Sequence, residues 1–281
     1  DTNRQGGLLD VTLDPDFARN STIYLSFAEP RGDGKNGTSV ARARLGESGL
    51  TDLKVIFRQE PAMASGHHFG SRLVFGRDGT LFVTLGDRNS GRQSVQQLDN
   101  HIGKVVRIDR DGNVPQDNPF RGKAGAKPEI WSTGHRNVQG AALDPATGEL
   151  WTNEHGPRGG DELNRTLAGR NYGWPVVTYG VEYSGAKISD RTEAPGFESP
   201  VHQWTPSIGT SGLAFYTSSR IPGWQGSVFV GGLASRDVAR LELRDGKVVH
   251  EERLFGKELG KRIRTIVAGP DGALYLLTDE G

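Results

Sequence analysis

The stretch WTNEHGPRGGDELN, residues 151–164, is dense in side chains that could do chemistry. Zinc would need further histidine, cysteine or carboxylate ligands at tight spacing, and no HExxH pattern is present. Calcium fits better, because it accepts backbone carbonyls as well as carboxylates, and Gly156 and Pro157 form a turn with three acidic residues nearby. A polar loop held by its own hydrogen bonds is an equally good interpretation from the local sequence alone.

A histidine pair, His67 and His68, stands before an expected strand in SGHHFGSRL. Neutral imidazole is suited to removing a proton near neutral pH, and Asp87, at the end of the partner strand, could orient such a base. Most histidine pairs are structural, and an aspartate in this position often caps its own turn. The sequence therefore offers a candidate acid/base pair beside an ordinary structural explanation.

Two further loops carry cations. Arg136 and Asn137 in STGHRNVQG combine a fixed cation with a neutral donor, which suits a carboxylate or a developing oxyanion. Arg262 and Arg264 in KRIRTIV are two residues apart, hence on the same face of an expected strand, where a bound anion would relieve their repulsion. Exposed basic pairs on edge strands are the more common explanation, and both interpretations stay open.

Repeated hairpins must position these groups. An apolar strand, a turn with aspartate, proline or glycine, and a second strand recur along the chain, at residues 8–29, 71–87, 138–154, 211–233 and 263–280. The Asp-Gly turns supply hairpin chemistry, and a period of about 60 to 70 residues suits propeller blades with loop insertions. No segment sustains a helical stripe over about twelve residues. The pattern predicts an all-β propeller.

Composition narrows the function classes. Lys+Arg 34 balances Asp+Glu 34, so the chain has no basic footprint for nucleic acid, and the expected partner is small or neutral. The absence of cysteine excludes disulfides, thiolate metal sites and a cysteine nucleophile. No apolar run is long enough to span a bilayer. Gly 40 in 281 residues, scattered among apolar runs, indicates many tight turns.

Taken together, the loops resemble, in order and spacing, those of the soluble quinoprotein sugar dehydrogenases, the PQQ-dependent aldose or glucose dehydrogenase family. The matching stretches are QGGLLDVTLDPDF, GHHFGSRLVFGRDGTLFVTLGD, QLDNHIGKVVRIDRDGNVPQDNPF, GHRNVQG, NEHGPRGGDELN, GRNYGWP and RIRTIVAGPDGALYLLTDE. The resemblance implies a six-bladed β-propeller of four-stranded antiparallel blades. It also implies oxidation of aldoses to lactones with PQQ and Ca²⁺, transfer of electrons to an acceptor, and a periplasmic or secreted location.

The resemblance assigns catalytic roles residue by residue. His68 would take the proton from the anomeric hydroxyl while a hydride passes to C5 of PQQ, and Asp87 would hold the working tautomer of this histidine. Arg136 and Asn137 would lie beside the quinone oxygens, where a cation stabilises the charge that develops on reduction.

The resemblance also assigns metal and cofactor contacts. Gly156 and Pro157 would hold the calcium that bridges to PQQ through their backbone carbonyls, which leaves His155 as a bystander. Glu162 and Tyr172 would bind a separate, structural calcium. The remaining contacts to PQQ are implied for Gln5, Tyr183, Arg262 and Arg264.

Two departures from the family pattern matter. Ala234 stands where the glucose-oxidising members present a lysine to PQQ, and we expect the nearby Arg236 to substitute. The family pattern has about one more blade before Gln5, so residues 1–281 are expected to form one propeller domain, truncated at the N-terminus and slightly at the C-terminus, with the first blade incomplete or missing. Two alternatives are a metal-dependent lactonase and a catalytically silent binding module; the second predicts loss of the histidine or of the arginines.

Overall fold

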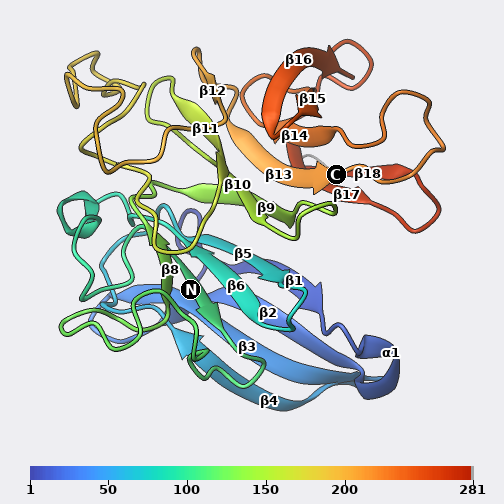
Figure 1. Cartoon of the computed structure of the whole chain (residues 1–281). Coiled ribbons are helices and arrows are strands. Elements are labelled where there is room, and N and C mark those ends of the chain that lie inside the picture. Colours follow the sequence, from blue (N-terminus) through green and yellow to red (C-terminus); the bar gives the residue numbers. More distant parts are fainter. Residues whose placement is uncertain (280–281) are drawn as a thin grey trace. The chain divides into compact units, whose positions relative to one another are not determined.

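The computed structural model describes residues 1–279, which form antiparallel sheets in two compact units (Figure 1). The first unit comprises Asp1–Val138 and Leu167–Pro175, and the second comprises Gln139–Thr166 and Val176–Gly281. Helical structure in the described residues is confined to α1 (Phe17–Asn20) and the 3-10 turn η1 (Arg92–Ser94). No helix there has the length and apolarity to cross a membrane.

The first unit contains two four-stranded sheets whose strands follow chain order. One sheet consists of β1 (Leu8–Leu13), β2 (Thr22–Pro30), β3 (Asn36–Gly46) and β4 (Gly49–Arg58). The other consists of β5 (Gly70–Phe75), β6 (Leu81–Leu85), β7 (Lys104–Ile108) and β8 (Ile130–Thr133).

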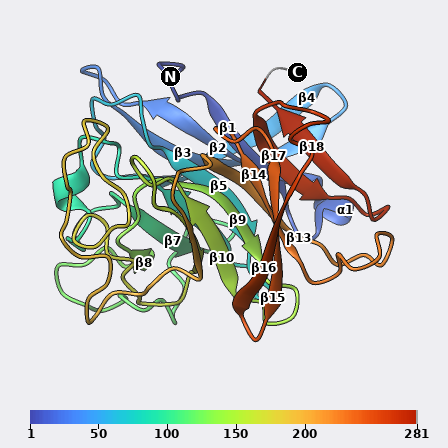
Figure 2. The ribbon, with the colours of Figure 1, turned by 90° about the horizontal axis from the view of Figure 1, so that it is seen from above.

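The second unit contains two more four-stranded sheets and one two-stranded sheet. The first is β9 (Val138–Leu143), β10 (Leu150–Glu154), β11 (Asp161–Arg165) and β12 (His202–Trp204). The second is β13 (Thr210–Phe215), β14 (Val228–Gly232), β15 (Val238–Arg244) and β16 (Lys247–Leu254). The third is β17 (Ile263–Ala268) with β18 (Leu274–Thr278), and Figure 2 shows both strands from above.

The five predicted hairpins are confirmed as the antiparallel pairs β1–β2, β5–β6, β9–β10, β13–β14 and β17–β18. The β5–β6 turn shows why the aspartate and glycine recur. Gly79 adopts a left-handed φ of 78°, and Asp78 Oδ1 accepts hydrogen bonds from the backbone N and the Oγ1 of Thr80 at 3.0 and 2.7 Å. The fold is thus all-β with propeller-type blades, whereas the number of blades in the ring and the single domain stay predictions.

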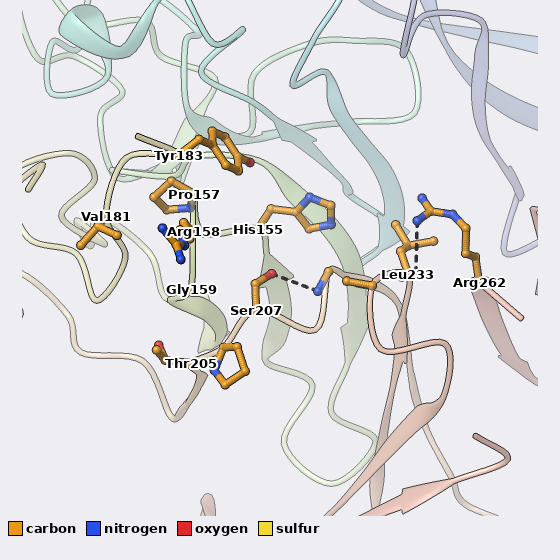
Figure 3. Close-up of a pocket in the computed structure, with 14 residues that line it drawn as sticks. His155, Pro157, Arg158, Gly159, Val181, Tyr183, Thr205, Ser207, Leu233 and Arg262 are labelled. Carbon is orange, nitrogen blue, oxygen red and sulfur yellow. Dashed lines mark hydrogen bonds between the residues drawn. The ribbon is translucent and has the colours of Figure 1, made fainter. Parts of the chain in front are cut away.

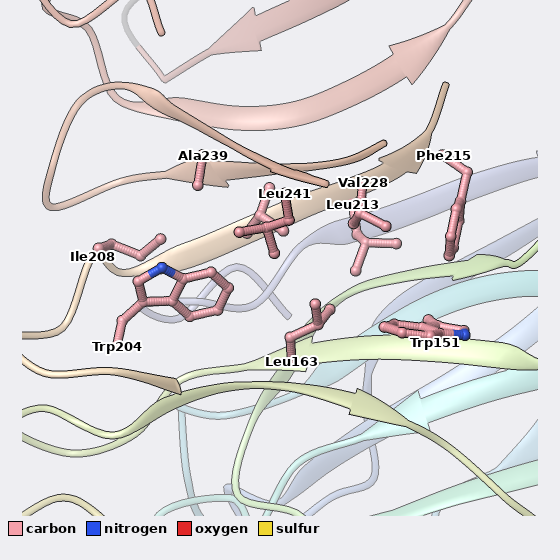
Figure 4. Close-up of a cluster of buried hydrophobic side chains, with 10 residues drawn as sticks. Trp151, Leu163, Trp204, Ile208, Leu213, Phe215, Val228, Ala239 and Leu241 are labelled. Carbon is pink, nitrogen blue, oxygen red and sulfur yellow. The ribbon is translucent and has the colours of Figure 1, made fainter. Parts of the chain in front are cut away.

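Each unit has an apolar core between its sheets. In the first unit, every residue of β6 and β7 is buried, and Leu81, Val83 and Leu85 pack with Val106 and Ile108. In the second unit the core is built mainly from β10, β11, β13, β14 and β15 (Figure 4), and its largest members are Trp151, Trp204 and Phe215. Trp151 meets Phe215 edge to face, with ring centroids 5.7 Å apart. These packed strands fix the loops that follow them.

The core of the first unit makes a testable prediction. Leu81→Ala removes a side chain that is 0% exposed and should lower the free energy of unfolding by about 2–5 kcal/mol, because the cavity cannot collapse fully. Leu53→Ala, on β4 and 63% exposed, should change it by less than about 0.5 kcal/mol. Urea titration of both variants measures the difference, and equal losses would contradict the assigned core.

Candidate functional site

The clearest catalytic geometry is a hydrogen bond between His68 and Asp87 in the first unit. His68 Nδ1 lies 2.6 Å from Asp87 Oδ1, and the two residues are 9% and 1% exposed. The antiparallel hairpin explains the meeting, because the residues before β5 and after β6 lie at the same end of the pair. The predicted acid/base pair is therefore present as a structural contact.

Two contacts hold His68 in a strained backbone conformation. Its φ of 51° is left-handed, which is uncommon for a residue with a Cβ. Its backbone N donates to Gln5 Oε1 at 2.8 Å, so Gln5 lies beside the base. Gly86 passes so close that an added Cβ would lie 2.0 Å from the His68 carbonyl oxygen. Only glycine therefore fits at position 86 without moving the base.

Asp87 has further donors that the sequence did not reveal. Trp174 Nε1 donates to Asp87 Oδ2 at 2.8 Å, and the backbone N of Asn89 donates to Oδ1 at 2.7 Å. The Arg136 guanidinium lies over the Trp174 ring, 5.4 Å from its centroid. Trp174 stands in GRNYGWP, where the aromatic residue between turn formers gives no indication of a partner 87 residues away.

Arg136 and Asn137 also belong to this cluster, and both are buried. The Arg136 carbonyl accepts a hydrogen bond from Asp87 N at 2.7 Å, and Asn137 Oδ1 accepts one from Gly70 N at 3.3 Å. The HRN triplet could have been a chance surface sequence. Instead it lies against the start of β5, next to His68, and against Asp87, which follows β6.

The electrostatics favour a neutral imidazole beside an ionised carboxylate. Burial lowers the pKa of His68 below its usual 6.5, Asp87 opposes that change, and the Arg136 cation adds to it. Burial acts to raise the pKa of Asp87, but the hydrogen bond with His68 and the charge of Arg136 outweigh it, so that pKa lies below its usual range. His68 can therefore accept a proton at neutral pH, and Asp87 can stabilise the resulting cation.

In the second unit, the 154–161 loop is organised by a buried aspartate. Asp161 accepts hydrogen bonds from the backbone N of Gly156 at 2.9 Å, Gly209 at 2.7 Å and Thr210 at 3.2 Å, and from Ser207 Oγ at 2.8 Å. Its oxygens are thus engaged with the chain's own donors. Asp161 therefore shapes the loop.

A cavity of about 720 Å³ opens beside this loop (Figure 3). Gly156, Pro157, Tyr183 and Arg262, four of the residues expected to hold a cofactor or its metal, line it together with Ala234. The remaining lining residues are His155, Arg158, Gly159, Val181, Thr205, Pro206, Ser207, Gly209 and Leu233. His155, expected to be a bystander, therefore contributes to the wall, and its Nε2 lies 2.5 Å from the Thr210 carbonyl.

The anion expected between Arg262 and Arg264 is supplied by the chain itself. Asp279 accepts from Arg262 Nε at 3.0 Å and from Arg264 Nε at 2.8 Å, and the hydrogen bond from Arg264 lowers the pKa of Asp279. Arg262 also donates to the Leu233 carbonyl at 3.2 Å (Figure 3). β17 begins at Ile263, so Arg262 precedes the strand on which it was placed. Arg236, which is exposed, is not among the residues that line the cavity.

The predicted ligands of a structural metal lie in different units. Glu162 faces Glu154 directly across the β10–β11 pair, and Asn164 Nδ2 lies 3.1 Å from Glu162 Oε2 and 3.4 Å from Glu154 Oε1. Burial and the Glu154 charge raise the pKa of Glu162 to about 8, so the pair requires a proton or a cation near neutral pH. Tyr172 is buried in the first unit, stacked on His135 with ring centroids 4.8 Å apart.

Within residues 1–279, no cluster of three or more His, Cys, Asp or Glu side chains could hold a metal ion. The expected site residues instead fall into two groups. The first unit contributes Gln5, His68, Asp87, Arg136, Asn137 and Tyr172, and the second contributes Gly156, Pro157, Glu162, Tyr183, Arg236, Arg262 and Arg264.

Comparison with known proteins identifies relatives over the whole chain. Residues 1–281 match the Glucose / Sorbosone dehydrogenase family. The chain is 48% identical over 280 residues to aldose sugar dehydrogenase YliI of Escherichia coli K12, which covers 98% of this chain and 75% of that protein. A crystal structure of a glucose dehydrogenase is 52% identical, with a TM-score of 0.96, and the match covers 98% of this chain and 80% of that one. The PQQ-bound aldose sugar dehydrogenase of Streptomyces coelicolor is 29% identical, with a TM-score of 0.77 and coverage of 98% and 74%.

The His68–Asp87 geometry makes a prediction about titration. The imidazole pKa should lie below 6.5, and Asp87→Asn should lower it further, because the carboxylate is the group that favours the protonated ring. NMR of histidine-labelled protein, with His68 assigned from the His68→Gln variant, measures both values. A pKa above 6.5, or an upward shift in Asp87→Asn, would contradict the assigned environment.

Proposed function

The chain belongs to the Glucose / Sorbosone dehydrogenase family of oxidoreductases, and from this premise we propose that it oxidises aldose sugars to lactones with PQQ and Ca²⁺. Electrons then pass to an external acceptor, and the family resemblance favours a periplasmic or secreted location. The buried His68–Asp87 pair carries the proposal, because oxidation of a hydroxyl-bearing carbon needs a base for the hydroxyl proton.

The cavity of the second unit has the features that PQQ requires. Its volume of about 720 Å³ accommodates a cofactor-sized molecule, and Arg262 offers a cation to a carboxylate. Gly209 lines the wall, and an added Cβ there would come within 2.9 Å of Ala234 N, so the close packing of the 209 and 234 backbones in this wall requires glycine. As the resemblance implies, we propose Tyr183, Arg262, Arg264, Gln5, Arg136 and Asn137 as contacts to PQQ.

Calcium is proposed at two places. Gly156 and Pro157 line the cavity, and Ca²⁺ accepts backbone carbonyls of this kind. Their loop is fixed by Asp161 whether or not an ion is bound. The resemblance assigns Glu162 and Tyr172 to a separate structural calcium; at Glu162, the opposition to Glu154 would be relieved by a divalent cation as well as by a proton.

Protein groups carry the proton chemistry. His68 Nδ1 is committed to Asp87, which leaves Nε2 to take the proton from the anomeric hydroxyl. Asp87 remains ionised and stabilises the imidazolium, while burial, aided by the Arg136 cation, keeps the resting imidazole neutral. When bound, PQQ supplies the hydride acceptor, and calcium acts on it as a Lewis acid.

The first test is reconstitution. Metal-free protein mixed with PQQ and Ca²⁺ should reduce a dye in the presence of aldoses, and a chelator should abolish the rate. His68→Gln should bind PQQ with unchanged affinity but lose about 10²- to 10⁴-fold in kcat, because positioned proton transfer is lost. Absence of calcium-dependent PQQ binding would refute the proposal. Binding without turnover in the unmodified protein would favour a binding module, and lactone hydrolysis without PQQ would favour a lactonase.

The second test concerns the cation that replaces the family lysine. If Arg236 compensates for Ala234, Arg236→Ala should weaken PQQ binding about tenfold, as should Arg262→Ala, because each removes a charge-assisted contact. Arg220→Ala is the control, since Arg220 pairs with Asp271 in the same unit and does not line the cavity. Equilibrium titration with PQQ measures all three. Unchanged affinity in Arg236→Ala would remove Arg236 from the cofactor site.

A further inference from the structure

Arg88 is a buried cation that the proposed chemistry does not use. It follows Asp87 directly, is 0% exposed, and forms no salt bridge with a carboxylate within the described chain. Burial lowers the pKa of Arg88 to about 10, while the charge of Asp87 opposes that change, so the guanidinium is charged at neutral pH. Burying a charge without an opposite partner is costly unless hydrogen bonds compensate. The position of this cation therefore requires an explanation.

The guanidinium hydrogen-bonds to the segment that precedes the base and to Asn36 at the start of β3. Nε donates to the His67 carbonyl at 3.0 Å, Nη2 donates to the Ser65 carbonyl and, at 2.6 Å, to Asn36 Oδ1, and Nη1 donates to the Asn36 carbonyl at 3.4 Å. Ser65 Oγ returns a hydrogen bond to the Arg88 carbonyl at 2.6 Å. The rigid planar fork thus joins β3 to two carbonyls of the segment that leads into His68.

Aromatic packing fixes the other side of the same segment. The guanidinium carbon lies 3.8 Å from the centroid of the Phe69 ring, and Phe69 is 2% exposed. Arg88 therefore contacts the residues immediately before and immediately after His68. The carbonyl of His67, which accepts the hydrogen bond from Arg88 Nε, belongs to the peptide group that joins His67 to His68. Rotation of that peptide group would therefore break the hydrogen bond.

His68 needs such a restraint. Its left-handed φ of 51° is disfavoured for a residue with a Cβ, and strained conformations of this kind persist only where the surroundings impose them. The ring contact with Asp87 fixes the side chain, but it does not fix the backbone from which the side chain projects. Relaxation to an ordinary φ would swing the imidazole away from the carboxylate.

We propose that Arg88 is a positioning residue for the base: its guanidinium holds the backbone on both sides of His68 so that the ring stays on Asp87. The dipeptide Asp87–Arg88 then holds the base twice, by its ring through Asp87 and by its flanking backbone through Arg88. The inference rests on the proposed function, because His68 is the base only in that reaction.

Arg88→Gln and Arg88→Lys test the role in the protein reconstituted with PQQ and Ca²⁺. Arg88→Gln should lose about 10²-fold in kcat, the cost of a small misplacement of a catalytic group, with KM for the sugar and PQQ affinity little changed. Arg88→Lys should recover part of that loss, because lysine keeps the charge but cannot span the same acceptors.

Arg107→Gln is the matched control. Arg107 is also buried in the first unit, at 4% exposed, but it binds Asp78, Thr80 and Asp117 around the turn at the opposite end of the β5–β6 hairpin. It should lower the thermal midpoint without lowering kcat. Unchanged kcat in Arg88→Gln, or a loss of kcat in Arg107→Gln equal to that in Arg88→Gln, would overturn the proposal.

The His68 ring gives a readout that does not need turnover. In cofactor-free protein, Arg88→Gln should move the His68 imidazole resonances and change the pKa of His68, while Arg107→Gln leaves both unchanged. The titratable and charged groups around the ring are Asp87, Arg136 and His67, all retained in these variants. If the unmodified protein oxidises no sugar, the proposed function fails, yet this titration still decides the role of Arg88. If Arg88→Gln does not fold, Arg88→Lys alone is compared with Arg107→Gln, and unmoved His68 resonances overturn the proposal.

Discussion

The 2.6 Å contact between His68 and Asp87 is the interaction on which the proposed chemistry depends. A buried carboxylate and a buried imidazole are each unfavourable alone, and together they stabilise each other only in one orientation. That orientation requires a glycine at position 86, a left-handed residue at position 68 and a tryptophan donor from a distant loop. The left-handed φ at His68 and the glycine at position 86 would each cost stability on their own, and both serve this one hydrogen bond.

The second unit is organised around a carboxylate as well, although its task differs. Asp161 begins β11 and joins the 156 turn to the 207–210 segment, so two loops far apart in the sequence form one cavity wall. Gly156 and Pro157 therefore lie in a turn whose backbone is held by hydrogen bonds within the chain. A ligand that binds a wall held in this way has little to reorganise, which preserves binding energy.

Much of the fold followed from the sequence, because the inner hairpins combine alternating apolar residues with Asp-Gly turns. The outer strands were not delimited: β4, for example, has mostly exposed residues and no clear alternation. The His68–Asp87 pair was predictable because hairpin geometry brings the two ends together. Trp174 was not, since no local pattern relates a loop to a carboxylate far along the chain.

The register of the β17–β18 hairpin decides which anion the pair Arg262 and Arg264 meets. The β17–β18 hairpin was predicted, and Ile263 pairs with Thr278, so Arg262 and Asp279 lie across from one another and share a backbone hydrogen bond of 3.1 Å. The pairing shifts at an irregularity between Ile263 and Thr265, which the sequence pattern does not locate. The sequence therefore suggested a bound anion between the two arginines, whereas the structure places the carboxylate of Asp279 beside them.

The two buried aspartates, Asp87 and Asp161, differ in whether a hydrogen-bond partner can gain a proton near neutral pH. Asp161 accepts hydrogen bonds from backbone N–H groups and a serine hydroxyl, which do not titrate near neutral pH, so its environment stays constant. Asp87 divides its oxygens between neutral donors and one imidazole. When that imidazole gains a proton, the contact becomes an ion pair at low local dielectric and strengthens at that moment. Only an aspartate that keeps one titratable partner can contribute more to the protonated state than to the resting one, and this separates Asp87, proposed to be catalytic, from Asp161, which shapes its loop.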